Sequence, residues 1–149
     1  MYVLGCAALA LLSVPCIGVI AAIAIPAFTS YTRRARSIEA RTNVAIIVRG
    51  VESVCATGAL PGPAGPTPAT PGSERQVATF GPEWASVGFS PTEPVYYSYS
   101  ITRASPSTVV VAAEGDLNGD GARSRFESMC MLAGASCTCT PVVVTNELD

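Results

Sequence analysis

The first 55 residues carry two hydrophobic patterns in succession. Residues 2–28 contain no charged side chain and are mostly apolar. Apolar residues then recur at steps of three and four, as on one face of an amphipathic helix: Phe28, Tyr31, Ala35, Ile38, Ala40, Val44, Ile47, Val48, Val51 and Val54. The arginines and glutamates fall mostly elsewhere around the helix. The pattern predicts one long helix with an apolar half at residues 2–28 and an amphipathic half at residues 29–55.

The apolar half is long enough to cross a membrane, because about 20 residues of helix span the hydrocarbon core. A cleaved secretory signal is the alternative. Its apolar region would be roughly 7–15 residues long and would follow a basic start, whereas this chain starts without Lys or Arg. We therefore expect a retained transmembrane segment. Pro15 and Pro26 are expected to kink it, since a proline ring removes one donor and crowds the carbonyl a turn earlier.

The pattern changes again beyond the helix. Residues 56–93 form a loop region, whose first part, Ala56–Ser73, holds five Pro and four Gly and excludes a helix or a central strand. A flexible linker and a long loop laid over a sheet both fit this composition. Alternating residues within 94–149 predict four antiparallel strands, near residues 95–101, 107–114, 124–132 and 138–145. The expected fold is α+β, with the long helix packed on a small antiparallel sheet, here called the head.

Charge is distributed unevenly along the chain. Residues 1–55 hold five Arg and two Glu, whereas residues 56–149 hold four Arg and nine acidic residues. An acidic head is a poor surface for nucleic acid. The chain has no His and no Lys, and no nucleophile motif or phosphate loop is recognisable. We therefore expect a protein that is not an enzyme.

Four of the six cysteines lie in the head or at the end of the helix. They are Cys55, Cys130, Cys137 and Cys139. An even set in a small non-cytosolic domain predicts two disulfides, with three pairings open. Unpaired thiols are one alternative. A zinc site is another, although one residue between Cys137 and Cys139 is a tighter spacing than zinc ligands usually have.

One motif carries a specific chemistry. The stretch DLNGDGARSRFE matches the spacing of a calcium-binding loop over residues 116–127. Alternate side chains would converge on the ion and the last carboxylate would close the site. The candidate ligands are Asp116, Asn118, Asp120, Ala122 through its carbonyl, Ser124 and Glu127. A plain polar turn is the alternative, since Asn-Gly and Asp-Gly are turn formers.

The stretch GVIAAIAIPAFTSYTRRARSIEA, residues 18–40, resembles the N-terminal helix of type IV pilins and pseudopilins. The order of Gly18, the apolar run, Pro26, a tyrosine and a basic cluster carries the resemblance. The family's glutamate at the fifth mature position is not matched, because aligning Pro26 puts Leu9 there. The basic leader of the family is not matched either, and Leu4 takes the place of its final glycine.

This resemblance implies a structural subunit of a type IV pilus or pilus-like filament, anchored in the bacterial inner membrane before assembly. Its implied partners are other copies of the chain through the N-terminal helices, membrane lipid, an assembly ATPase and platform, and a prepilin peptidase. A single-pass anchored binding module that never polymerises is one alternative. A minor pilin or type II secretion pseudopilin is another.

The location of the head is predicted in two ways that disagree. Arginines follow the apolar span, which would keep the head in the cytoplasm by the positive-inside rule. Disulfide-type cysteines and the resemblance place the head outside the cytoplasm, on the cell surface once a filament assembles. We favour the second location, and it predicts that the cysteines are oxidised.

Overall fold

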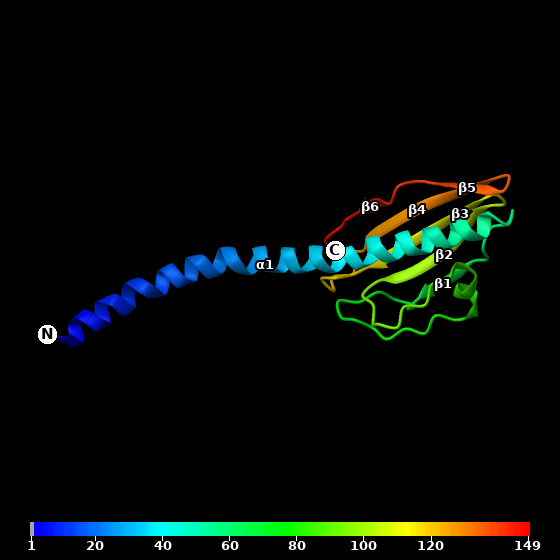
Figure 1. Ribbon diagram of the computed structural model, residues 1–149. Coiled ribbons are helices and arrows are strands. Elements are labelled where there is room, and N and C mark those ends of the chain that lie inside the picture. Colours follow the sequence, from blue (N-terminus) through cyan, green and yellow to red (C-terminus); the bar gives the residue numbers. More distant parts are fainter. Residues whose placement is uncertain (1) are drawn as a thin grey trace. The chain divides into compact units, whose positions relative to one another are not determined.

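The computed structural model describes the backbone of residues 2–149 and the side chains of residues 18–149. Helix α1 extends over Tyr2–Cys55, as the two hydrophobic patterns predict (Figure 1). The chain divides into two compact units between Thr32 and Arg33. The second unit contains the last turns of α1 and the whole sheet, so the sheet and the helix that covers it belong to one body.

One face of α1 is buried in the second unit. Its residues follow steps of three and four and are Ser37, Ala40, Val44, Ile47, Val51 and Cys55, each no more than 2 % exposed. This spacing keeps them on one side of a helix with 3.6 residues per turn. The apolar members of this face, from Ala40 to Cys55, pack against aromatic and β-branched residues of the sheet in a single core cluster. The predicted packing of the amphipathic half against the head is confirmed.

The predicted face was wrong at its beginning. Phe28, Tyr31 and Ile38 were assigned to it, and they are 67 %, 72 % and 60 % exposed. Ile38 follows the buried Ser37 directly, and one residue turns a helix by about 100°, so its side chain points away from the sheet. Phe28 and Tyr31 belong to the first unit.

The sheet has six strands, all paired antiparallel. The strands are β1 (Ala64–Thr67), β2 (Ser98–Ser105), β3 (Thr108–Gly115), β4 (Ser124–Ala133), β5 (Ser136–Cys139) and β6 (Val143–Thr145). Their spatial order is β1-β2-β3-β4-β5, and β6 also pairs with β4. Buried residues alternate along β4 from Ser124 to Cys130, which is the period expected when one face meets a core.

Four strands were predicted and six are present, for two reasons. The expected last strand is divided into β5 and β6, which pair with different parts of β4. Pro141 lies between them, and a proline cannot donate to a strand ladder. The other addition is β1, which lies within the Pro/Gly-rich segment. It occupies the edge of the sheet, where prolines are tolerated.

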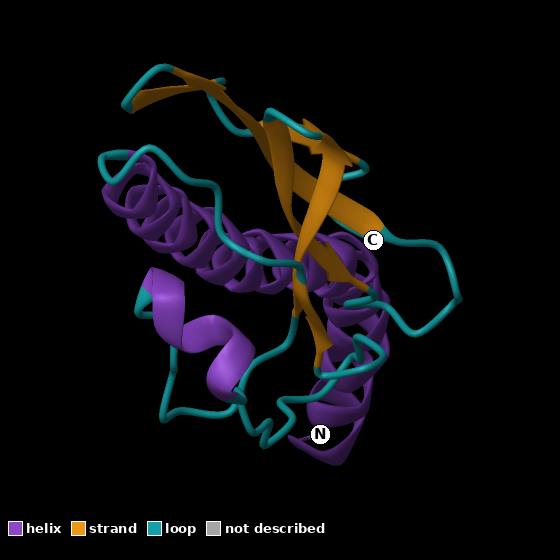
Figure 2. Cartoon of the chain, turned by 90° about the vertical axis from the view of Figure 1, so that its right-hand side faces the viewer, coloured by secondary structure: helices purple, strands orange, loops and turns teal. Residues whose placement is uncertain are grey.

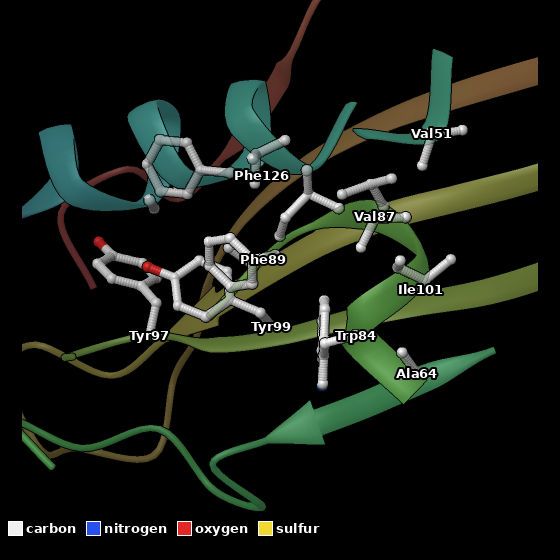
Figure 3. Packing of buried hydrophobic residues seen from close by; sticks show 14 of the residues in the cluster. Val51, Ala64, Trp84, Val87, Phe89, Tyr97, Tyr99, Ile101 and Phe126 are labelled. Atoms are coloured by element: carbon white, nitrogen blue, oxygen red, sulfur yellow. The ribbon is translucent and has the colours of Figure 1, made fainter. Parts of the chain in front are cut away.

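The loop region between α1 and β2 forms a second cover over the core (Figure 2). It contains the 3-10 helix η1 (Pro82–Val87), whose Trp84 and Val87 are buried. The end of η1 approaches α1 at Gly50, where a Cβ would collide with the Val87 carbonyl. Trp84, Phe89 and Tyr99 pack together, with the Phe89 ring centroid 5.4 Å from Trp84 and 5.3 Å from Tyr99 (Figure 3).

Candidate functional site

The predicted calcium loop connects β3 to β4 and is closed by its own side chains. The Asp116 carboxylate accepts the Gly119 N–H at 2.7 Å and the Gly121 N–H at 3.2 Å. Asp120 accepts the Ala122 N–H at 2.7 Å and an N–H of the Asn118 side chain at 2.8 Å. Short polar side chains that bond backbone N–H groups nearby stabilise tight turns. Four of the six candidate ligands are therefore organised in one turn.

The remaining two candidate ligands lie on β4 and point to opposite faces of the sheet. Ser124 is buried, and its hydroxyl donates to the carbonyls of Gly115 at 3.3 Å and Asp149 at 3.0 Å. Glu127 lies three residues after Ser124 on the same strand, so its side chain is on the opposite face, away from the helix. It accepts the Arg125 Nε–H at 2.8 Å. Successive strand residues alternate between faces, so this strand separates the two groups.

Within residues 18–149, no three acidic or cysteine side chains converge as a metal site would require. The motif was recognised from spacing that assumes a helix after the loop, whereas a strand follows it. Calcium binding stays a prediction. A calcium titration of the native chain and of Glu127→Ala, followed by the melting temperature, tests it directly.

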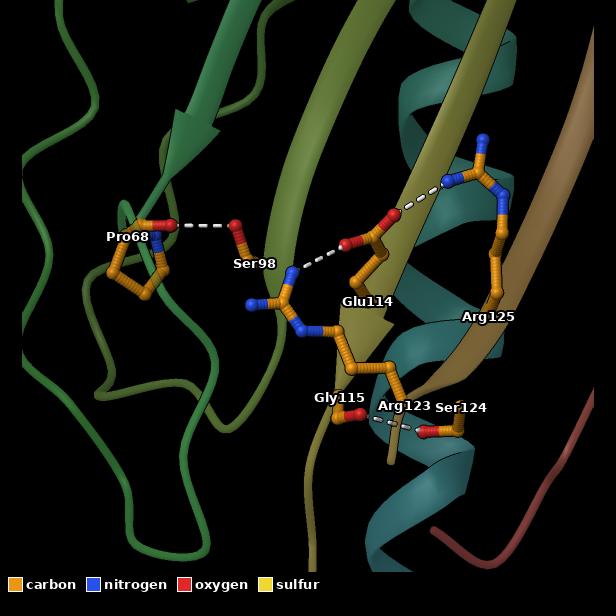
Figure 4. Close-up of polar contacts among 7 residues, drawn as sticks. All are labelled: Pro68, Ser98, Glu114, Gly115, Arg123, Ser124 and Arg125. Atoms are coloured by element: carbon orange, nitrogen blue, oxygen red, sulfur yellow. Dashed lines mark hydrogen bonds and ion pairs between the residues drawn. The ribbon is translucent and has the colours of Figure 1, made fainter. Parts of the chain in front are cut away.

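A chain of ion pairs lies on the face of the sheet away from α1 (Figure 4). Glu114 on β3 pairs with Arg123 at 2.9 Å and with Arg125 at 2.5 Å, and Arg125 also pairs with Glu127. The hydrogen bond to Glu127 raises the pKa of Arg125 above its usual value. These side chains are a third to a half exposed, so each pair contributes at most about 1 kcal/mol. We interpret the network as a structural feature of the outer face.

The four candidate cysteines form two disulfides. Cys55, the last residue of α1, bonds to Cys137 on β5. Cys130 on β4 bonds to Cys139, its direct partner in the ladder with β5. The prediction of oxidised cysteines is confirmed, and the structure selects one of the three open pairings. Both bonds gather at the point where the helix ends, so they fix β5 to the helix and to the sheet.

Apolar side chains are exposed on α1 before the second unit begins. Val19, Ile20, Ile23 and Ile25 are 62–69 % exposed. Large apolar residues grouped in this way mark a surface that contacts lipid or protein. No helix within the described residues is long and apolar enough to span a bilayer. Most of the predicted apolar half, residues 2–17, lies outside the described side chains.

Hydrogen bonds between polar residues join α1 to the sheet, and the sequence did not predict them. The Glu39 carboxylate accepts the Tyr99 hydroxyl at 3.1 Å and the Tyr96 N–H at 2.9 Å. Asn43, one turn further along α1, donates to the same Tyr99 hydroxyl at 2.8 Å. The sequence feature that could have indicated these hydrogen bonds is the spacing of Glu39 and Asn43. They are polar, lie beside the buried face and are four positions apart, which places both on one side of the helix.

Two buried tyrosines differ in how their hydroxyls are bonded. Burial, followed by the nearby Glu39 charge, raises the pKa of Tyr99. Burial also raises the pKa of Tyr97 to about 12, while the nearby Ser124 hydroxyl opposes that shift. Among the described side chains the Tyr97 hydroxyl is buried without a hydrogen-bond partner, because Ser124 donates to carbonyls instead. Neither tyrosine is accessible from the surface.

The C-terminal residues contact both the helix and the sheet within the second unit. Arg33 donates to the Leu148 carbonyl at 3.4 Å, and Arg41 pairs with Glu147 at 3.5 Å. Ser124 on β4 donates to the Asp149 carbonyl. These contacts stabilise the helix against the sheet at its Arg33 end, opposite the disulfides.

Comparisons with protein-family models, with curated proteins and with solved structures found no match to this chain.

Proposed function

We propose that this chain is a structural subunit of a type IV pilus-like filament, anchored in the inner membrane before assembly. The observation that carries the proposal is the difference in exposure along α1. The large apolar residues of Val19–Tyr31 are 62–72 % exposed, while Ala40, Val44, Ile47 and Val51 are fully buried by the head. A helix of this kind is stable in lipid or among similar helices.

The composition of the exposed segment suits helix association. Gly18, Ala21, Ala22 and Ala24 are small, and small residues let helix backbones approach closely when lipid offers no hydrophobic driving force. Repetition of one contact with a rotation that does not close produces a filament. The membrane anchor is inferred from the sequence of residues 2–28, whose length suffices for a bilayer.

The disulfides support a head outside the cytoplasm. Two disulfides in a domain of this size are typical of oxidising compartments. A prepilin peptidase, an assembly ATPase and a platform follow only from the resemblance of residues 18–40 to type IV pilins. Leu9, in the place of the family's glutamate, favours the alternative of an anchored binding module that does not polymerise.

Expression of the full chain in a pilus-competent bacterium distinguishes these functions. Surface fractions removed by shearing are examined by negative-stain microscopy and the mature N-terminus is determined by mass spectrometry. We expect filaments that contain this chain. Recovery only in the detergent-extracted inner membrane would contradict the filament and support the binding module.

Variants at Phe28 test whether the exposed apolar residues of α1 pack between subunits. Phe28→Asp places a charge in the exposed apolar segment and should abolish filaments while the head still folds and forms both disulfides. Phe28→Leu is the matched control, because it keeps an apolar side chain of similar size. Filaments that persist in Phe28→Asp would show that this segment is not packed between subunits.

A further inference from the structure

Three arginines of α1 lie within one helical turn where the second unit begins, and a fourth arginine lies over the same tyrosine ring as one of them. Arg33, Arg34 and Arg36 are the first charged residues after an uncharged stretch from Tyr2 to Thr32. Arg75 joins them from the loop that precedes η1. We call these four residues the arginine patch.

Tyr96 connects the loop arginine to the helix. The Arg36 guanidinium lies 4.9 Å from the centroid of the Tyr96 ring, and the Arg75 guanidinium lies 5.3 Å from it. Arg36 also donates to the Ser73 carbonyl at 3.3 Å, which ties the loop to α1. Residues separated by about 40 positions in sequence are thus held in one patch by cation–π contacts.

The arginine patch has no carboxylate partner in the part of the chain that the structure describes. The ion pairs there use Arg41, Arg123 and Arg125. The neighbouring acids are largely engaged: Glu39 accepts Tyr96 N–H and the Tyr99 hydroxyl, and Glu147 pairs with Arg41. Glu74 precedes Arg75 in the chain, and Glu93 lines the same surface pocket as Arg75. Neither glutamate forms an ion pair with Arg75.

We propose that the arginine patch binds the phosphates of anionic phospholipids at the membrane surface. The inference rests on the membrane anchor of the proposed function, and it adds the lipid class that the anchored subunit recognises. A guanidinium presents donors in a planar fork that matches phosphate oxygens. Arg34 and Arg75 are exposed, so their donors are free to bind a headgroup.

Chain order favours lipid over other phosphates. A patch that directly follows an apolar helix is carried to the headgroup region when that helix enters the bilayer. Each arginine close to the membrane raises the affinity for an anionic lipid surface by up to about fivefold. The same contact explains why basic residues flank the apolar segment on the side of a disulfide-bonded head, against the positive-inside rule.

The test uses the full chain reconstituted in phosphatidylcholine bilayers. Electron spin resonance measures how much spin-labelled phosphatidylglycerol, compared with spin-labelled phosphatidylcholine, is motionally restricted by the protein. We expect a preference for phosphatidylglycerol that falls with rising salt. The double variant Arg34→Gln, Arg75→Gln should lower it at least about twofold. These two arginines make no hydrogen bond to the head that the substitution would remove.

Arg49→Gln is the matched control, because Arg49 is an exposed arginine on the same helix outside the patch. It should leave the lipid preference unchanged. Inorganic phosphate at constant ionic strength should compete weakly, and full competition would assign the patch to a free anion and overturn the inference.

The remaining outcomes separate the two proposals. Equal restriction of both lipids would overturn the lipid inference and leave the anchor intact. Restriction of neither lipid would contradict the membrane anchor itself, and the inference would fall with it. Salt-sensitive oligomers without lipid preference would assign the arginines to the acidic head of a second copy.

Discussion

Helix α1 contains two stretches with large apolar residues that differ in what covers them. Ile47 and Val44 are fully buried against the sheet, whereas Ile23 and Phe28 are 69 % and 67 % exposed. Both stretches have the propensity to form helix, so local preference does not explain the difference. The buried stretch is stabilised by the head of the same chain. The exposed stretch has no equivalent cover among the described residues, and its apolar surface is the reason to infer an external partner.

The largest expected effect comes from the bond that joins the buried stretch to β5. Cys55 and Cys137 are 82 positions apart, and Cys130 and Cys139 are 9 apart. Because a longer loop loses more entropy when it is closed in the unfolded chain, Cys55→Ala with Cys137→Ala should cost about 4–5 kcal/mol.

The second disulfide provides the comparison. Cys130→Ala with Cys139→Ala should cost about 2–3 kcal/mol. Chemical denaturation of the two double variants measures both values. A larger loss for the short loop than for the long one would contradict this account of how the helix end is fixed.

Two adjacent isoleucines on the helix test the packing itself. Ile47 is fully buried and Ile46 is 43 % exposed. Ile47→Ala should lower the free energy of unfolding by about 3 kcal/mol, from lost transfer energy and a remaining cavity. Ile46→Ala should change it by less than about 1 kcal/mol. Equal losses in urea denaturation would mean that the two faces of the helix are covered alike.

Sequence predicted the features that depend on local periodicity. Steps of three and four residues indicated the helix, and alternation indicated the strands that became β2, β3 and β4. An even cysteine set indicated disulfides. The prediction failed at Phe28, because the helical pattern shows which residues are apolar and not where the head begins to cover them. It failed at Ile38 because this apolar residue lies about 100° around the helix from the buried Ser37.

Features that depend on tertiary contacts were not predictable. Cys137 and Cys139 lie two residues apart on one strand, so both face the same side and spacing alone does not choose their partners. The edge strand β1 is formed by a Pro/Gly-rich segment through two register pairs with β2. The hydrogen bonds of Glu39 and Asn43 with the Tyr99 hydroxyl could not be predicted either, because they depend on how the helix packs on the sheet.

The buried tyrosines give a smaller, pH-dependent effect on how the head holds the helix. Tyr99→Phe removes the hydroxyl bonded to Glu39 and Asn43, and should cost about 1–2 kcal/mol at pH 7. Tyr97→Phe should be nearly neutral or stabilising, since the Tyr97 hydroxyl is buried without a partner. Thermal denaturation of the two variants makes the comparison, and a larger loss for Tyr97→Phe would contradict it.

Tyr97 also makes the free energy of unfolding depend on pH in the alkaline range. Burial raises the pKa of Tyr97 from 10.0 to about 12, so folding favours its protonated form. This contribution is complete below pH 10 and is lost as the pH rises through 12, at about 1.4 kcal/mol per pH unit. Tyr97→Phe should therefore flatten the fall in stability between pH 10 and 12. An unchanged slope would assign alkaline unfolding to other groups.

The smallest expected effect is on the exposed stretch. Phe28→Ala should change the free energy of unfolding of the head by less than about 0.5 kcal/mol in detergent, because its side chain is 67 % exposed and lies in the other compact unit. The same variant should weaken association between subunits, since a large apolar side chain would be lost from the contact. Chemical cross-linking in membranes measures that association, with Ser30→Ala as the control on the same turn. Destabilisation of the head by Phe28→Ala, with association intact, would mean that the head itself covers this stretch of helix.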